Sequence, residues 1–313
     1  MIPNAEEMTR RRYLLAVGTA ATLSGCADTT TPATESETTP TPENPLGETD
    51  ARYREATYRE TAEGLFRIKA AIPKGEGPFP VVVHVHGGAW RYGEPRLRGV
   101  QRLVERDIAT ASVEYRLSGT ATYPAPVRDV VAAVQWVRAN EPGWNIDPDR
   151  VALLGGSAGS HLAALVAGAP DQPNFQPEGF DADASAAVDA AVLHYGIYDL
   201  TGRDACADRN TKQFFGDDCA SESVVAEASP ITHVDATHPP VFLFHGDADE
   251  LVPVEQSRRY RDALDAAGVP VEYTELDGAR HGYIDPNNER MADTRRDVHD
   301  QTADFLLEGP LAE

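Results

Sequence analysis

Short apolar runs rich in β-branched residues recur along the chain, separated by segments that contain Pro and Gly. Runs of this length, bounded by such turn residues, predict buried strands. The predicted strands cover residues 65–72, 81–85, 109–115, 151–154, 190–194, 241–244 and 271–276.

Helical patterns lie between several of these strands. The clearest is an apolar stripe with i, i+3, i+4, i+7 and i+10 spacing, formed by Val127, Val130, Val131, Val134 and Val137. A second helix follows Ser157, and a third spans about 256–267. This alternation predicts an α/β fold whose mostly parallel sheet is covered by helices on both faces, with sites at the carboxyl ends of the strands. Segments 171–184 and 201–230 interrupt the alternation, and we expect them to be flaps over such a site.

The first fifty residues have the pattern of a targeting signal followed by a tether. A run Thr-Arg-Arg-Arg-Tyr-Leu precedes a short apolar stretch and resembles a twin-arginine export signal. Leu23-Ser24-Gly25-Cys26 resembles a lipobox, in which the cysteine is lipidated. We therefore expect a signal peptide over 1–25, a Thr/Pro/Glu-rich tether over 26–50 and one folded domain over 51–313. Export would then anchor the domain to the outer face of the cytoplasmic membrane through Cys26. The alternative is a basic, apolar N-terminus with a chance cysteine.

The charge balance excludes some partners. The 313 residues include 28 Lys+Arg against 50 Asp+Glu, a net charge of −22. Nucleic acid is not an expected partner, because a phosphate backbone requires a basic surface. Only three residues are lysines, and scarce lysine with abundant carboxylates resembles proteins adapted to molar salt, where screening relieves carboxylate repulsion. The alternative is a merely acidic protein.

Two further cysteines, Cys206 and Cys219, favour a disulfide in an exported chain; two separate thiols are the alternative. Histidines, cysteines and carboxylates show no metal-ligand spacing, so we expect neither a metal nor a cofactor. Oligomeric state leaves no mark in the sequence.

The chemistry-bearing motif is Gly155-Gly156-Ser157-Ala158-Gly159, which follows a predicted strand and opens a helix. A serine nucleophile in such a strained turn needs glycines two positions away on each side. Upstream, another strand ends in His86-Gly87-Gly88-Ala89-Trp90. The N–H groups of Gly87, Gly88 and Ala158 are expected to form an oxyanion hole.

Downstream, two further strands are followed by groups that complete such a site. The first runs into His245-Gly246-Asp247-Ala248-Asp249-Glu250, and the next is followed by His281. An acid followed by a histidine completes the chain order Ser, Asp, His expected on this kind of sheet. Position in the chain leaves the choice of acid open.

With these motifs the chain resembles the α/β-hydrolase superfamily, and within it the acetyl-xylan and feruloyl esterase-like group. Tyr115-Arg116-Leu117, Tyr123-Pro124 and Ala228-Ser229-Pro230 add to the resemblance, which covers about 55–307. It implies an eight-stranded sheet and a triad of Ser157, Asp249 and His281, with Asp247 or Glu250 as alternative acids. It also makes Trp90 and Tyr123 candidates for the substrate pocket.

Two departures argue against a capped lipase. Gly156 stands where hormone-sensitive-lipase-like members carry Asp, and about 35 residues between Ala51 and His86 are too few for a large N-terminal cap. The other histidines are expected to be structural. His84 should point away from the site, His86 and His245 should organise turns, and His161 should support the helix that follows Ser157.

The resemblance implies a serine esterase that acts on small-molecule or carbohydrate esters through an acyl-enzyme. Trp90 after Gly-Gly-Ala also resembles kynurenine-formamidase-like relatives, which leaves amide or peptide hydrolysis as an alternative. A lipid-anchored binding protein without catalysis is the remote alternative.

Overall fold

The computed structural model describes residues 51–313 except 98–99, 140, 180–183, 203, 284–289 and 313. The side chains of 141–142 and 290–293 are also outside the description. The predicted signal peptide, the lipidation site Cys26 and the tether therefore lie outside the described residues. Among the helices described, none combines the length and the hydropathy needed to cross a membrane.

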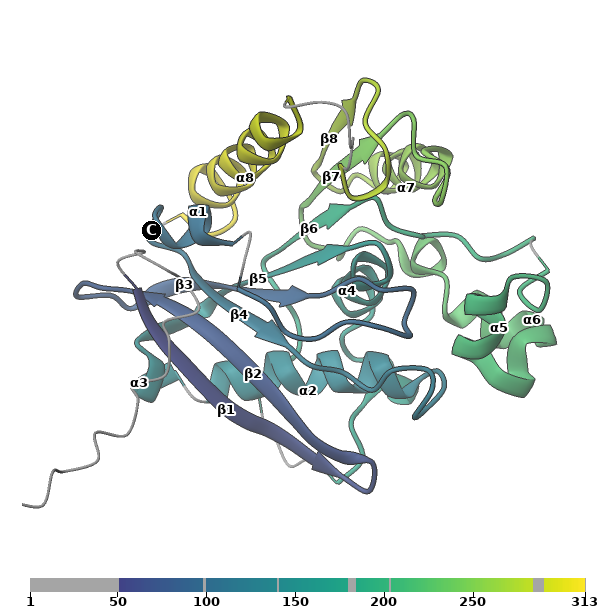
Figure 1. The fold of residues 1–313 in the computed structure, drawn as a ribbon, viewed down its shortest axis with the longest axis horizontal. Coiled ribbons are helices and arrows are strands. Elements are labelled where there is room, and N and C mark those ends of the chain that lie inside the picture. The colour runs from purple at the N-terminus through teal and green to yellow at the C-terminus, as the bar shows by residue number, and fades with distance from the viewer. Residues whose placement is uncertain are drawn as a thin grey trace, which may run out of the picture. The chain divides into compact units, whose positions relative to one another are not determined.

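The described strands form one sheet in the order β1-β2-β4-β3-β5-β6-β7-β8 (Figure 1). Strands β1 and β2 are antiparallel to their neighbours, and all pairs from β4 to β8 are parallel. The eight-stranded, mostly parallel sheet is confirmed, and every predicted strand is present. The bounds are β1 Ala51–Thr61, β2 Gly64–Pro73, β3 Phe79–Val85, β4 Ala109–Val113, β5 Ile146–Gly156, β6 Ala190–His194, β7 Val241–Gly246 and β8 Val271–Leu276.

Helices cover both faces of this sheet. The longer α-helices are α2 Ala125–Ala139, α4 Ala158–Gly168, α7 Glu255–Ala266 and α8 Arg290–Glu308, and the shorter ones are α1 Gln101–Val104, α3 Glu141–Trp144, α5 Arg209–Phe215 and α6 Glu222–Glu227. Single 3-10 turns occur at η1 Pro173–Phe175, η2 Gly216–Ala220, η3 Pro230–His233 and η4 His281–Tyr283.

The alternation of side chains along the strands separates two cores. Val81 and Val83 of β3 belong to the core that also includes residues of α2, α4 and α7, whereas Val82 belongs to the core that includes residues of α1 and α8. The five valines of the predicted α2 stripe are all fully buried in the first core. In Figure 1, α8 and α1 lie together on one side of the sheet and α2 on the other.

Strand β1 was not predicted, because its polar and apolar side chains do not alternate cleanly. A buried ion cluster ties it to the core. Asp129 of α2, fully buried, lies 2.5 Å from Arg59 of β1 and accepts hydrogen bonds from the backbone and guanidinium of Arg116. One carboxylate thus pairs with two largely buried guanidinium groups, of which Arg116 also lies 3.4 Å from Glu63, and it links α2 to β1 and to the segment after β4.

Candidate active site

The turn around Ser157 joins the end of β5 to the start of α4. Ser157 has φ = 55°, a conformation that costs energy for any residue with a side chain. A Cβ on Gly155 would lie 2.4 Å from the carbonyl oxygen of Gly159, and one on Gly159 would lie 2.1 Å from that of Val85. Glycine at both positions therefore lets β5, α4 and the end of β3 approach one another, which presents the Ser157 hydroxyl at the carboxyl edge of the sheet.

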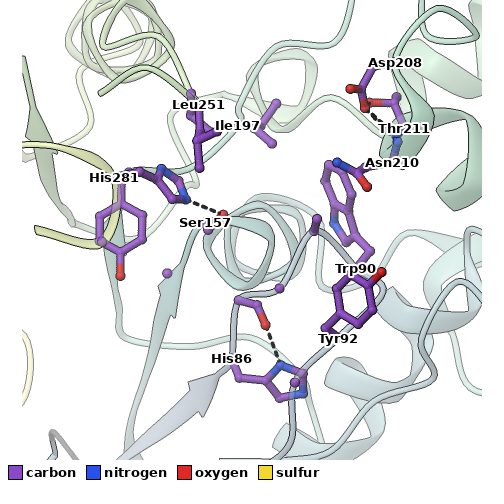
Figure 2. Close-up of a pocket in the computed structure, with 18 of the residues that line it drawn as sticks. His86, Trp90, Tyr92, Ser157, Ile197, Asp208, Asn210, Thr211, Leu251 and His281 are labelled. Atoms are coloured by element: carbon purple, nitrogen blue, oxygen red, sulfur yellow. Dashed lines mark hydrogen bonds between the residues drawn. The ribbon is translucent and has the colours of Figure 1, made fainter. Parts of the chain in front are cut away.

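A chain of hydrogen bonds starts at this hydroxyl. Ser157 Oγ lies 3.0 Å from Nε2 of His281, and Nδ1 of His281 lies 2.7 Å from Oδ2 of Asp249. A carboxylate only accepts, so Nδ1 carries the proton and Nε2 is left as the acceptor for the Ser157 O–H. Figure 2 shows the His281 ring directed at Ser157. The three residues come from the loops after β5, β7 and β8, which meet at one edge of the sheet.

Of the three acidic residues after β7, Asp249 is the one that bonds His281. Its side chain is fully buried, and burial alone would raise its pKa. Hydrogen bonds from His245, His281 and the backbone N–H of Val252 outweigh that effect and hold the pKa of Asp249 below its usual range. Asp247 is exposed and accepts from the N–H of Gly278 instead, while Glu250 is exposed.

The turn after β3 packs directly against the Ser157 turn. A Cβ on Gly87 would lie 2.7 Å from the Gly156 carbonyl oxygen and 3.2 Å from Cβ of Ser157. His86 Nδ1 donates to the Gly87 carbonyl at 2.8 Å, and because the peptide is planar and trans the N–H of Gly88 points the opposite way. His86 is therefore a turn-organising residue, as predicted. At the start of α4, the N–H of Ala158 has no partner within its helix.

Trp90 and His161 hold this turn against α4. Trp90 is 2% exposed, donates from Nε1 to Nδ1 of His161 at 3.2 Å, and stacks on Phe214. Since Nδ1 accepts, Nε2 of His161 is the protonated nitrogen and donates to the Ala228 carbonyl at 2.8 Å. Burial lowers the pKa of His161 to about 4, so the ring stays neutral in this structural role.

A cavity of about 960 Å³ opens around the Ser157 hydroxyl. Gly87, Gly88, Trp90, Ser157 and His281 all line it. In Figure 2, His281 lies on one side of Ser157, and Trp90, Tyr92 and Asn210 lie on the other. Leu251 lies near His281, and Ile197 lies between His281 and Trp90.

The segment 201–230 supplies one wall of this cavity, as predicted. A disulfide joins Cys206 to Cys219 across 13 positions, and the residues it brackets include Asp208, Asn210 and Thr211 of the lining. Arg91 donates to Asn210 at 3.0 Å, which connects this wall to the turn after β3. The sequence offered no direct signal for Asn210 or Tyr92 as lining residues.

Three predictions need correction. Tyr123 does not line the cavity, because its ring packs among Phe175, Phe214 and Phe215 and its hydroxyl donates to Glu227 at 2.7 Å. The described part of 171–184 lies away from the cavity, since Phe175 is pulled into the core. His84 was expected to alternate away from the site, but it is among the residues that line the cavity, and its Nδ1 lies 3.1 Å from Oγ of Ser112.

Within the described ranges, no group of three or more His, Cys, Asp or Glu side chains is placed so that it could hold a metal ion.

The chain is similar in sequence or in structure to several named proteins. The chain is 38% identical over 216 residues to esterase LipQ of Mycobacterium tuberculosis, covering 65% of this chain and 50% of LipQ. Thermogutta terrifontis esterase 2 phosphonylated by sarin superposes with a TM-score of 0.71 at 25% identity, over 83% of this chain and 96% of that one. A truncated carbohydrate esterase from gut microbiota superposes with a TM-score of 0.67 at 25% identity, over 82% and 98%.

The chain thus has the α/β-hydrolase fold, and it spans about half the length of the curated relatives it matches. A family model named BD-FAE matches residues 70–264, more than half of the sequence and all of the segments from β3 to the loop carrying Asp249. The chain belongs to the BD-FAE family.

Proposed function

We propose that this chain is a serine carboxylic ester hydrolase in which Ser157 is the nucleophile, His281 the general base and Asp249 the acid that orients it. The observation that carries the proposal is the hydrogen-bonded chain from Ser157 through His281 to Asp249, placed at a cavity large enough for a small ester. Relatives named as esterases support the same chemistry.

The geometry allows each step to be assigned an atom. Ser157 Oγ attacks the acyl carbon while its proton moves to Nε2 of His281, and the carboxylate of Asp249 stabilises the charged imidazole. The N–H groups of Gly87, Gly88 and Ala158 stabilise the oxyanion, which is worth about 3–4 kcal/mol per donor in comparable sites. The proton on His281 then passes to the departing alcohol oxygen, which leaves an acyl group on Ser157.

Hydrolysis of the acyl-enzyme reverses these roles. Water gives its proton to Nε2 of His281 and attacks the acyl carbon, and the second tetrahedral intermediate uses the same N–H groups. Collapse of this intermediate expels Ser157 Oγ, which takes its proton back from His281. The products are a carboxylic acid and an alcohol, and no cofactor enters either half of the reaction.

Short-chain acyl esters, including those of carbohydrates, are the substrate class we propose. A named carbohydrate esterase among the structural neighbours supports it, as do the polar side chains of the cavity wall, Asp208, Asn210 and Thr211. Trp90 and the disulfide-bracketed wall lie on the side of the cavity away from His281, where they would contact the group held there.

The test is hydrolysis of p-nitrophenyl acetate by the purified domain in molar KCl. Ser157→Ala should abolish turnover and labelling by a fluorophosphonate probe, while Ser160→Ala is the matched control. Ser160 is fully buried on the same helix and bonds Tyr198 rather than His281, so its loss should leave turnover nearly unchanged. Near wild-type hydrolysis by folded Ser157→Ala would refute the assignment. Rates on acetylated xylan, feruloyl esters, N-formyl aromatics and short peptides would then rank ester against amide substrates.

We also propose export through the N-terminal signal and anchoring by lipidated Cys26, which the motif order at 1–26 supports. Cys26→Ser should move the protein from the membrane fraction to the medium of an expressing host. Retention of the Cys26→Ser protein in the membrane fraction would contradict lipid anchoring.

A further inference from the structure

His245 is a fully buried histidine directly beside the proposed triad. Its Nε2 lies 3.3 Å from Oδ2 of Asp249 and 2.9 Å from the carbonyl oxygen of Val252. Its Nδ1 lies 2.7 Å from Oγ of Ser257, which is itself fully buried on α7. The triad does not use either side chain, and the sequence had suggested only a turn-organising role for His245.

The partners determine where the protons lie. Nε2 of His245 faces a carboxylate and a carbonyl, both of which only accept, so Nε2 carries the ring proton and shares it between them. Nδ1 is then the acceptor, and the Ser257 hydroxyl donates to it. The hydroxyl of Ser257 therefore selects the tautomer of His245 that donates to Asp249.

We propose that His245 and Ser257 are positioning residues for hydrolysis, which hold the Asp249 carboxylate at the distance and orientation that His281 requires. The inference rests on the proposed triad and adds two residues to it. Both act through Asp249, since neither contacts His281 or Ser157 directly in the described hydrogen bonds.

The loop that carries Asp249 explains why such support is needed. It leaves the sheet at Gly246 and reaches α7 at Glu255, and its Leu251 is 75% exposed. Oδ1 of Asp249 accepts from the N–H groups of Leu251 and Val252, which belong to this same loop. His245 on β7 and Ser257 on α7 connect the carboxylate to two rigid elements instead. Without them, the carboxylate that orients His281 would be held in place only by its own loop and by His281.

The hydrogen bond from His245 also affects the negative charge of the Asp249 carboxylate beside His281. Oδ2 receives both the Nδ1–H of His281 and the Nε2–H of His245, so part of its negative charge is already engaged. Removing His245 takes away one of the hydrogen bonds that hold the pKa of Asp249 below its usual range, so the carboxylate beside His281 becomes more basic. The other groups around His281 stay in place: Tyr195 packs edge-on against the ring, and Arg295 of α8 donates to the Gly282 carbonyl.

The test compares three variants by the pH profile of kcat/KM and by kcat per probe-titrated active site. His245→Leu removes the donor, and His245→Gln supplies an amide N–H in its place. Ser257→Ala removes the hydroxyl that selects the tautomer, which also bonds Tyr198. His238→Leu is the matched control. It is another buried histidine with a carbonyl and a hydroxyl partner, Pro239 and Tyr260, and the described hydrogen bonds of His238 do not include a triad residue.

His245→Leu should lower kcat about tenfold, the effect of one lost hydrogen bond to a charged group, and move the acid limb of the profile to higher pH. His245→Gln should recover most of kcat and return the limb toward its wild-type position. Ser257→Ala should shift the acid limb in the same direction as His245→Leu, by a smaller amount. If His245→Leu does not fold, Ser257→Ala is the variant that tests the inference. His238→Leu should lower stability and leave the profile unchanged.

Two results would overturn the inference: a wild-type profile and kcat in Ser257→Ala together with His245→Leu, or equal losses in His245→Leu and His238→Leu that follow their folded fractions. Either result leaves the proposed triad intact as long as Ser157→Ala remains inactive. Activity in Ser157→Ala would instead refute the proposed function itself.

Discussion

Replacing Gly87 by Ala should damage the proposed oxyanion hole without unfolding the domain. The added Cβ would sit 2.7 Å from the Gly156 carbonyl oxygen, whereas real Cβ contacts stay above 3.0 Å and are ordinary from 3.4 Å. The obstructing atom is backbone in the turn that holds Ser157, so the two turns must separate by about 0.3–0.7 Å. Catalytic geometry tolerates about 0.5 Å, and a misplacement of about 1 Å costs on the order of 100-fold.

We therefore expect kcat on p-nitrophenyl acetate to fall about 10- to 100-fold, since donors of this kind act mainly in the transition state. KM should change less. Overpacking of this kind costs about 1–3 kcal/mol, so the domain should still unfold cooperatively in a urea titration at molar KCl. Gly119→Ala is the control, because its Cβ would lie 3.7 Å from a flexible Gln213 amide. A folded Gly87→Ala enzyme with kcat within twofold of wild type would refute the reasoning.

Four further predictions follow from the same structure. Burial lowers the pKa of His161 to about 4 and that of His194 to about 3, so the unfolded chain binds more protons below pH 6.5; stability should fall from that pH downwards, by about 3 kcal/mol for His161 at pH 4, in urea titrations across pH. Asp129→Asn leaves the buried Arg59 without a carboxylate among the described residues and Arg116 with Glu63 alone, and it should lower the free energy of unfolding by about 3–5 kcal/mol; a loss under 1 kcal/mol would contradict the ion-cluster argument. The double variant Cys206→Ser with Cys219→Ser should lose about 3 kcal/mol of stability and raise KM more than it lowers kcat, because the disulfide brackets a cavity wall; an unchanged KM would remove that wall from substrate binding. Dilute buffer should destabilise a chain of net charge −22, and molar KCl should restore fold and activity. Full activity without salt would show that the negative charge is not an adaptation to salt.

Much of the architecture was predictable because it depends on patterns among residues that are close in the sequence. A strand or helix shows its buried face through the spacing of neighbouring residues, as the α2 valines do, and the glycines around Ser157 reflect close approaches that any such turn requires. Strand β1 escaped prediction because one edge of the sheet exposes many of its side chains, and its anchor, Arg59, pairs with a carboxylate 70 positions away.

The surroundings of the site were less predictable. The Tyr123-Pro124 motif made Tyr123 a candidate for the substrate pocket. Its ring instead packs in the aromatic cluster around Phe214, in the core and away from the cavity. The segment 171–184 had the composition of a flap, but burial of Phe175 places its described part elsewhere. In both cases the partner that decides the outcome lies far along the chain and leaves no local pattern.

By itself, the sequence determined the order of the strands from β2 to β8 and of the helices α2, α4 and α7, the nucleophile turn at Ser157 and the positions where an acid and a base could follow a strand. The family resemblance favoured Asp249 over Asp247 and Glu250 as the acid. Only the tertiary structure decided which carboxylate bonds His281, and that His245 and Ser257 contact the far side of this group as a hydrogen-bonded pair. The physical reason is one of range. Periodicity and turn chemistry act over a few residues, whereas a hydrogen bond between loops after β7 and β8 depends on how the whole sheet brings its carboxyl ends together.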